Sequence, residues 1–297
     1  VRARRMQRGP RTQLLLRLGY EGSAFFGVSP QPGRPTVALA LQQRVEASFG
    51  MPARALVVAS RTDAGVHAVE NLATCWFPVE LDPAELALKT ASQRGERGDG
   101  LLDVEAAIVP ASVFARGLGS GKIYRYRLEG GHDPALIARL RELELQRPRP
   151  PLPPALGRIW QVAPALDPAP MRQAAALLLG EQDFEAFTIK ARGQADARRR
   201  LDRIEIHELQ REGRPHLLIE VQAPSFLRKM VRIVVGTLAE VGVGMRDPAQ
   251  MPALLASRDR QQTGIAALAR GLVLHEILSE HKPFVGRWRE PDGLPEP

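Results

Sequence analysis

The order of the predicted strands and helices constrains the fold of this chain more than any other feature. Apolar strands and amphipathic helices in the first 110 residues predict the order β-α-β-β-α-β, which is that of a ferredoxin-like unit. The predicted segments are 13–20, 37–49, 55–60, 71–79, 83–93 and 101–109. Gly50 follows the first helix directly, as expected where a helix ends. This order predicts one complete ferredoxin-like half.

The rest of the chain repeats the order with one extra short helix. The corresponding segments are 122–130, 168–180, 201–209, 216–223, 225–242, 248–256 and 271–278. The repeat lies in the order of elements, because the residues themselves show no internal repetition. We therefore predict an α/β (α+β) fold of two tandem ferredoxin-like halves.

The predicted boundaries follow from composition. We expect a flexible basic arm over 1–11, a first half over 12–115, a second half over 116–281 and a tail over 282–297. A Pro-rich connector at about 146–170 should run as an extended segment or surface loop outside the core. The basic arm lacks a signal-type apolar segment, and no apolar run reaches membrane-spanning length, so we expect no membrane association.

The charge balance points to a polyanionic partner. Lys and Arg total 41 against 33 Asp and Glu, a formal net charge of +8, and most of the positive charge is arginine. Arginine suits bidentate phosphate contacts, which makes nucleic acid the leading partner class and an anionic membrane surface the alternative. Aromatic residues are 5% of the chain, too few for binding by base stacking alone. A catalytic pocket is therefore favoured over a bare RNA-binding module.

Several familiar site classes do not fit the sequence. The glycine-rich 117-GLGSGK-122 lacks the glycine and the Ser or Thr of a phosphate-binding loop. Cys75 is the single cysteine, which excludes a zinc-deaminase centre and an internal disulfide, and which suits a buried apolar role in a reducing cytoplasm. No Gly-x-Ser-x-Gly motif is present, and the histidines show no metal-ligand spacing.

The segment 61-RTDAG-65 is the candidate for chemistry that remains. On an extended segment Arg61 and Asp63 point the same way, and the small residues after Asp63 let a ligand come close to the carboxylate. Taken alone, such a turn is more often structural than catalytic. His67, a lone histidine, is expected to be a hydrogen-bonded structural residue.

Arg232 is a candidate partner for Asp63. It lies in the predicted helix 225–242 among apolar neighbours. Arg228 lies one turn before it with Lys229 beside them, which predicts a basic stripe on that helix. A buried arginine requires an anion, so we expect an ion pair with Asp63 that keeps the carboxylate ionised.

Five motifs in order resemble the TruA family of tRNA pseudouridine synthases. They are 19-GYEGSAFFG-27, 60-SRTDAGVHA-68, 122-KIYRYRL-128, 179-LGEQDFEAF-187 and 226-FLRKMVR-232. The resemblance covers nearly the whole chain. It implies a pseudouridine synthase fold with a central mixed sheet and a basic cleft, and an isomerase that converts uridine to pseudouridine in the anticodon arm of tRNA. It further implies a cytoplasmic homodimer that needs no cofactor and no metal.

The resemblance also implies the roles of five residues. Asp63 would be the catalytic aspartate, with Arg232 as its ion-pair partner and Tyr124 as the active-site tyrosine. Tyr124 could stack beneath the target base or help to remove its C5 proton, and the sequence does not choose between these roles. Arg61 would position the flipped nucleotide, and Arg116 would contact RNA.

The chain departs from the family pattern in its Pro-rich connector and within three of the motif segments. Ser60 replaces the usual glycine, Val28 stands where tryptophan is common, and 113-VFAR-116 lacks a histidine. A non-catalytic tRNA-binding protein of the same fold, and less favourably a hydrolase of the same N-glycosidic bond, are the alternatives. A glycosidase usually needs two paired carboxylates, whereas the motif supplies one.

Overall fold

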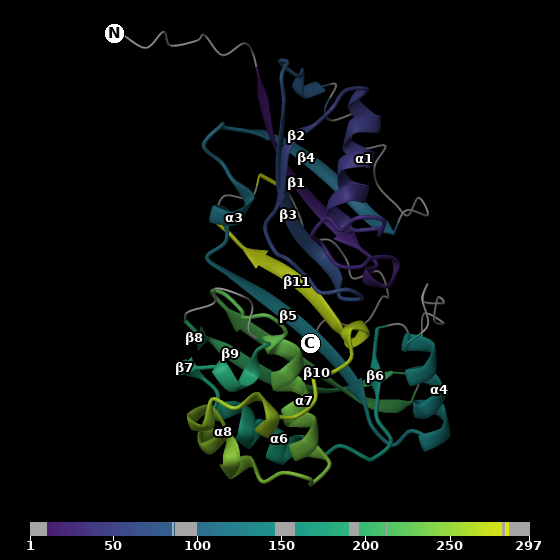
Figure 1. Cartoon of the computed structure of the whole chain (residues 1–297), viewed down its shortest axis with the longest axis vertical. Helices are drawn as coiled ribbons and strands as arrows, with labels where there is room; N and C mark the ends of the chain where they lie inside the picture. Colours follow the sequence, from purple (N-terminus) through teal and green to yellow (C-terminus); the bar gives the residue numbers. More distant parts are fainter. Residues whose placement is uncertain are drawn as a thin grey trace.

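The computed structural model describes residues 11–84, 86, 100–145, 158–189, 196–211, 213–280 and 283–284. The predicted basic arm, the predicted helix 83–93 for the most part, and the greater part of the connector and tail lie outside the described residues. Two groups of strands follow one another along the long axis of the molecule, with the N-terminal group uppermost in Figure 1. Strands β5 and β11 cross the middle of the view.

The first half forms one side of the sheet. Its elements are β1 (Thr12–Tyr20), α1 (Val37–Phe49), β2 (Arg54–Val58), β3 (His67–Phe77) and β4 (Leu101–Val109). Hydrogen bonds join the strands in the order β4-β1-β3-β2, and each of these pairs is antiparallel. The half therefore has its fourth strand beside its first and its second strand beside its third, as a ferredoxin-like unit requires.

The second half repeats this arrangement with additions. Its elements are α3 (Ala115–Leu118), β5 (Gly121–Glu129), α4 (Pro134–Leu145), β6 (Trp160–Gln161), α6 (Pro168–Ala176), β7 (Gly180–Asp183), β8 (Arg198–Leu201), β9 (Arg203–Arg211), β10 (Arg214–Ala223), α7 (Met230–Gly242), α8 (Met251–Ser257) and β11 (Leu272–Leu278). Its main strands pair in the order β11-β5-β10-β9, again antiparallel. The order of strands is thus the same in both halves.

A short parallel pairing joins the two halves into one sheet. Strand β11 of the second half pairs with the start of β3, where Val273 lies opposite His67 and Leu274 opposite Ala68. The sheet is consequently mixed but mostly antiparallel, and the expected fold class is confirmed. Because β3 begins at His67, this junction lies directly after the segment 61–65.

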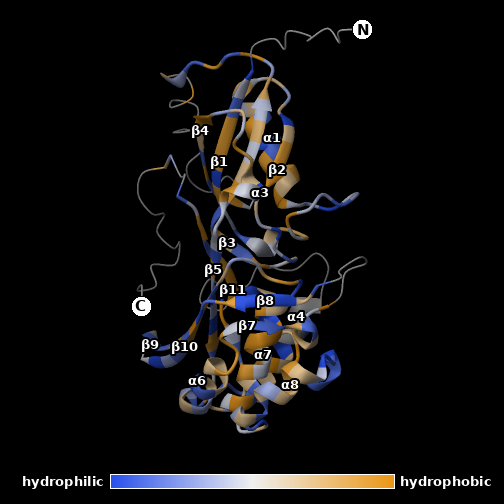
Figure 2. Ribbon diagram, turned by 90° about the vertical axis from the view of Figure 1, so that its left-hand side faces the viewer, coloured by the Kyte–Doolittle hydropathy of each residue, from blue (hydrophilic) through white to orange (hydrophobic). Residues whose placement is uncertain are grey.

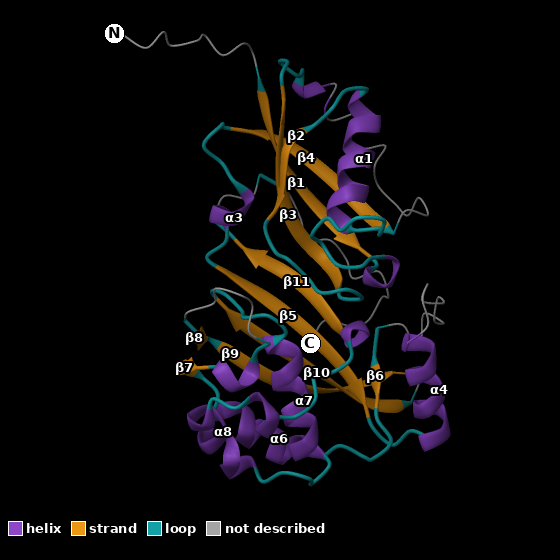
Figure 3. Ribbon diagram, viewed as in Figure 1, coloured by secondary structure: helices purple, strands orange, loops and turns teal. Residues whose placement is uncertain are grey.

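The helices bury apolar stripes against this sheet. In α1 the buried residues Val37, Leu41, Val45 and Phe49 recur every four positions, so they form one face. Helix α7 is buried along nearly its whole length and is coloured hydrophobic in Figure 2, whereas β8 is hydrophilic. Figure 2 shows α1 and α7 on the same side of the sheet, and Figure 3 shows how the loops between helices and strands gather where the halves meet.

Helix α7 begins later than the sequence predicts. It starts at Met230 and not at Ser225, because Lys229 has a left-handed backbone with φ 60° and ψ 8°. Arg228 therefore precedes the helix, and the predicted stripe of Arg228 and Arg232 on adjacent turns is wrong. The segment 225–229 instead forms a loop that faces the first half.

The composition of the connector also wrongly predicts that its end lies on the surface. Ile159, Trp160 and Gln161 are each at most 5% exposed, and Trp160 and Gln161 form β6, which pairs with β5. The expectation of a surface segment fails here because Trp160 packs edge-on against Tyr126 at 6.1 Å and fills the core. The helix predicted over 168–180 ends at Ala176, and Gly180 with φ 83° begins β7.

Candidate active site

Asp63 lies in the loop between β2 and β3, which the chain itself holds in a tight turn. The amide of Val66 donates to the carbonyl of Asp63 at 3.1 Å, and Gly65 adopts φ 83°, a conformation that glycine permits. Arg61, Thr62 and Asp63 all line one pocket, and of the three Thr62 is buried. Both predicted residues thus border the same pocket, and their common direction stays a prediction.

A buried polar network fixes this loop from behind. Asn71 on β3 accepts from the amide of Ser60 at 3.2 Å and donates to its carbonyl at 2.9 Å. Asn71 Nδ2 also donates to the hydroxyl of Tyr20 at 3.2 Å, and Tyr20 in turn shares a hydrogen bond of 3.0 Å with Thr62. Burial raises the pKa of Tyr20 far above its usual range, so its hydroxyl stays protonated. The network therefore fixes Ser60 and Thr62, the residues on either side of Arg61.

The segment after β1 supports the loop through close backbone contact. Gly27 has φ 92°, and a Cβ placed there would meet the carbonyl oxygen of Thr62 at 2.9 Å. The neighbouring Val28 donates its amide to that same oxygen at 3.3 Å. Only glycine allows this approach, so Gly27 supports the backbone of the loop that carries Asp63.

Arg232 and Asp63 form the predicted ion pair. Arg232 Nη1 lies 3.3 Å from Asp63 Oδ2, and their side chains are 14% and 29% exposed. Arg232 Nε also donates to the carbonyl of Ala267 at 2.7 Å, and the Ala267 amide donates back to the Arg232 carbonyl at 2.8 Å. The guanidinium is thus fixed by the second half while it holds a carboxylate from the first.

Tyr124 lies beside Asp63, on β5, with its ring in the pocket wall. The residue is 7% exposed, and its hydroxyl shares a hydrogen bond of 3.2 Å with Ser60 Oγ. Phe226 packs edge-on against the ring at 5.2 Å. Burial, together with the charge of Asp63, raises the pKa of Tyr124 to about 12, against the effect of the Ser60 hydrogen bond. The phenol is therefore neutral near pH 7.

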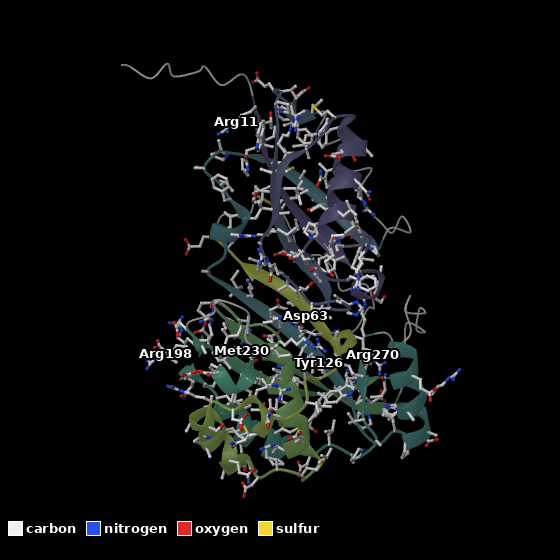
Figure 4. The ribbon with its side chains drawn as sticks, in the orientation of Figure 1. Arg11, Asp63, Tyr126, Arg198, Met230 and Arg270 are labelled. Carbon is white, nitrogen blue, oxygen red and sulfur yellow. The ribbon has the colours of Figure 1, made fainter. Side chains whose placement is uncertain are left out.

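These residues face a pocket between the two halves. Its volume is about 770 Å³, and Figure 4 places Asp63 near the middle of the long axis of the molecule. Six basic side chains line it, whereas Asp63 is the one carboxylate among the described lining residues. The basic residues are Arg34, Arg61, Lys122, Arg228, Lys229 and Arg232. The expected basic cleft is present around Asp63.

Not all predicted site residues meet in this pocket. Arg61 lines it and is exposed, so it is accessible to a substrate. Arg116 is exposed on α3 but is not a lining residue, so any contact it makes with RNA lies away from Asp63. His67 is fully buried, and its Nδ1 lies 2.7 Å from Glu21 Oε1. It is the structural residue that the sequence suggests.

Several lining residues escaped prediction, among them Ser60, Lys122 and Phe226. Ser60 and Lys122 adjoin predicted ones, and the alternation of β5 that turns Tyr124 inward also turns Lys122 inward, which was a usable signal. Phe226 gave no such signal, because the loop before α7 was predicted as helix. Lys229 was predicted beside Arg228 and Arg232, but as part of a helical stripe that the structure does not form.

The described part of the chain shows no obvious place for a metal. It contains no group of three or more His, Cys, Asp or Glu side chains arranged to hold an ion. None of its helices is long and apolar enough to cross a membrane. Cys75 is buried, and burial raises the pKa of its thiol to about 12, so it behaves as an apolar side chain.

Comparison with known proteins gives consistent matches. A family model described as tRNA pseudouridine synthase matches residues 174–278. A tRNA pseudouridine synthase A of Roseobacter denitrificans is 30% identical over 91% of this chain and 96% of its own length. Those of Myxococcus xanthus and Acidiphilium cryptum are each 34% identical over 91% of this chain, and over 93% and 97% of their own lengths. Among solved structures, a Cbf5-Nop10-Gar1 complex aligns at a TM-score of 0.29 and 14% identity, over 74% of this chain and 46% of that one.

Proposed function

The chain belongs to the tRNA pseudouridine synthase A family and is an isomerase that converts uridine to pseudouridine in tRNA, and we propose that Asp63 performs this reaction in the pocket between the halves. The observation that carries the assignment is the ion pair of Asp63 with Arg232 at 3.3 Å, beside a neutral Tyr124. It supports a carboxylate placed for chemistry at a position that a nucleotide can reach.

The reaction requires little beyond a well-placed carboxylate. The N1–C1′ bond breaks, the uracil turns, a C5–C1′ bond forms, and the proton lost from C5 is balanced by one gained at N1. Asp63 can attack C1′ as a nucleophile, or remove a proton from C2′ as a base. In both cases Arg232 offsets the charge of the carboxylate before the reaction and holds its orientation through Ala267.

Tyr124 is proposed as the platform on which the extruded base stacks. Taking a base out of its stack costs a few kcal/mol, and stacking on an aromatic ring recovers part of that cost. A phenol with a pKa of about 12 is a poor proton acceptor at neutral pH, which favours the platform over a proton-transfer role. Arg61, at the exposed edge of the pocket, is proposed to hold the nucleotide from outside.

Two other activities fit the site less well. A hydrolase of the N-glycosidic bond would be expected to pair two carboxylates, and the described pocket lining contains Asp63 alone. A non-catalytic tRNA-binding protein would not require a buried network behind one aspartate. Product analysis separates the three: pseudouridine in tRNA, free uracil, or unchanged RNA.

The test of the proposed function is pseudouridine mapping of total tRNA from cells that have the protein and from cells that lack it. We propose that the affected uridines lie in the anticodon arm, as the family resemblance implies. Loss of pseudouridine there on removal of the protein supports the proposal, and an unchanged map contradicts it.

We also propose, from the resemblance, that the enzyme is a cytoplasmic homodimer. Light scattering of the purified chain should give twice the monomer mass of 32.6 kDa. A mass of one chain at micromolar concentration contradicts the dimer without affecting the assignment of the reaction.

A further inference from the structure

Lys229 adopts a backbone conformation that lysine does not favour. Its φ of 60° and ψ of 8° lie in the left-handed region, where non-glycine side chains carry a steric cost. The neighbouring backbone imposes this conformation. Met230 donates its amide to Leu227 at 3.1 Å, and the carbonyl of Arg228 accepts from Thr188 Oγ1 at 3.0 Å. Glycine or asparagine would adopt this backbone conformation with less strain. A lysine at this position therefore indicates that its side chain has a role that offsets the strain.

The side chain lies where positive charge is in excess. It lines the pocket and is half-buried, and Arg228 and Arg232 line the same pocket. Burial first, then the charges of Arg232, Arg228 and Arg260, lower the pKa of Lys229, while Asp63 alone opposes them. Asp63 is already paired with Arg232 at 3.3 Å, and no second carboxylate lines the pocket among the residues that the structure describes. A negatively charged ligand would relieve this repulsion.

The distribution of lysine supports a selected role for the side chain. The sequence contains five lysines among 41 basic residues, and the two in the described part, Lys122 and Lys229, both line this pocket. An ammonium group is a compact charge on a flexible stem and can bind a phosphate oxygen.

We propose that Lys229 binds the phosphate of the uridine that enters the pocket and so sets the distance between its C1′ and Asp63. The inference rests on the proposed function, because the phosphate is that of the nucleotide to be isomerised. A neutral uracil carbonyl would leave the repulsion among the cations in place, whereas a phosphate removes it. Lys229 is therefore a substrate-binding residue, and its strained backbone is retained for that contact.

The first experiment separates strain from charge in purified enzyme with full-length unmodified tRNA. Lys229→Gly should raise the Tm by about 2 °C, because it relieves the left-handed strain. It should also lower the single-turnover rate of pseudouridine formation about tenfold to a hundredfold, the range for loss of a charged hydrogen bond. Lys229→Asn should lose a similar factor, whereas Lys229→Arg should stay within about threefold of wild type because the charge is kept.

Arg258→Gly is the matched control. Arg258 is also a basic residue in a left-handed conformation, with φ 53°, but it ends α8 outside the pocket and pairs with Asp183 at 3.0 Å. Its replacement should leave the rate unchanged and the Tm equal or slightly higher, since an exposed ion pair contributes little.

The second experiment identifies the group that Lys229 contacts. A ligated tRNA with one methylphosphonate at the phosphate of the target uridine should slow the wild-type enzyme by the factor that Lys229→Gly loses on ordinary tRNA. The same substitution should not slow Lys229→Gly further. The slope of log Kd against log salt should fall by about 0.7 to 0.9 in Lys229→Gly, as for one lost phosphate contact.

The possible outcomes separate a failure of this inference from a failure of the proposed function. A Lys229→Gly or Lys229→Asn enzyme within twofold of the wild-type rate overturns the inference while leaving Asp63 in its role. If Lys229→Gly is slower than wild type by the same factor on methylphosphonate tRNA as on ordinary tRNA, the phosphate contact is overturned. The amine would then contact the base or another group. Absence of pseudouridine in the wild-type reaction contradicts the proposed function itself.

Discussion

At the scale of single residues, Asp63 depends on neighbours that come from both halves of the chain. Arg232 pairs with it from α7, Tyr124 flanks it from β5, and Gly27 supports its backbone from the segment after β1. The pairing with Arg232 was predictable, because an arginine among apolar residues needs an anion. The hydrogen bond between Ser60 and Tyr124 was not, since nothing in the sequence relates two residues 64 positions apart.

The first prediction concerns Tyr124. If the ring acts as a stacking platform, Tyr124→Phe should keep pseudouridine formation within about threefold, although it leaves the Ser60 hydroxyl without this partner. Tyr124→Ala should lose about tenfold to a hundredfold, the range of one lost base-stacking contact. Single-turnover rates between pH 6 and pH 9 measure both. A Phe variant as slow as the Ala variant would show that the hydroxyl takes part in the chemistry.

At the scale of elements, the loops before α1 and α7 matter more than the helices themselves. Both loops line the pocket, and both owe their shape to residues with positive φ, Gly27 and Lys229. The sequence predicts α1 to the residue, because its apolar spacing and Gly50 agree. It misplaces the start of α7, because the left-handed turn at Lys229 depends on contacts with Thr188 and Ile189 that local sequence does not encode.

The second prediction tests the support of the loop that carries Asp63. Gly27→Ala should lower the free energy of unfolding by about 2 kcal/mol and reduce the rate, since its methyl group presses on the Thr62 carbonyl. The control Gly50→Ala has a similar φ of 65° with nothing within 4 Å, so it should cost about 1 kcal/mol and leave the rate unchanged. Urea unfolding and single-turnover rates compare the two. Equal effects on the rate would mean that the contact with Thr62 does not position Asp63.

The third prediction concerns the ion cluster that ties the connector to the first half. Arg158 donates to Glu21 at 2.7 Å, and Glu21 also lies 2.7 Å from His67 Nδ1. Burial alone would raise the pKa of Glu21, but hydrogen bonds and charges from His67 and Arg158 outweigh it and lower the pKa to about 2.

The sign of the pH dependence follows from this lowered pKa. The stabilisation from Glu21 is complete above its unfolded value of about 4.5 and is lost as the pH falls towards about 2. Glu21→Gln should therefore be less stable than wild type at pH 6, and the difference should shrink between about pH 4.5 and pH 2. Urea unfolding at several pH values measures it, and a difference that is constant with pH contradicts the cluster.

At the scale of the whole molecule, the order of elements predicted the repeated half correctly. The strand orders β4-β1-β3-β2 and β11-β5-β10-β9 follow from it without knowledge of the residues between. The sequence did not show how the halves join. The pairing of Val273 with His67 brings together strands 206 positions apart, and this contact places the pocket beside Asp63. The predicted domain boundaries remain predictions.

The connector shows the limit of composition as a guide. Its prolines favour an exposed segment, yet Ile159 and Trp160 enter the core, and Arg270 donates to the carbonyl of Ile159 at 3.1 Å. Trp160 is buried because its ring packs against Tyr126, which is distant in sequence. No local sequence pattern encodes such a tertiary contact.

The measurement that tests the account most directly is pseudouridine formation by Asp63→Asn on unmodified tRNA. Asparagine keeps the size of the side chain and can still hydrogen-bond to Arg232, but it cannot serve as nucleophile or base. We predict no detectable pseudouridine, with a tRNA Kd within about threefold of wild type, since one pocket residue contributes little to binding by the whole basic surface. Formation of pseudouridine at the wild-type rate would contradict the assignment of Asp63.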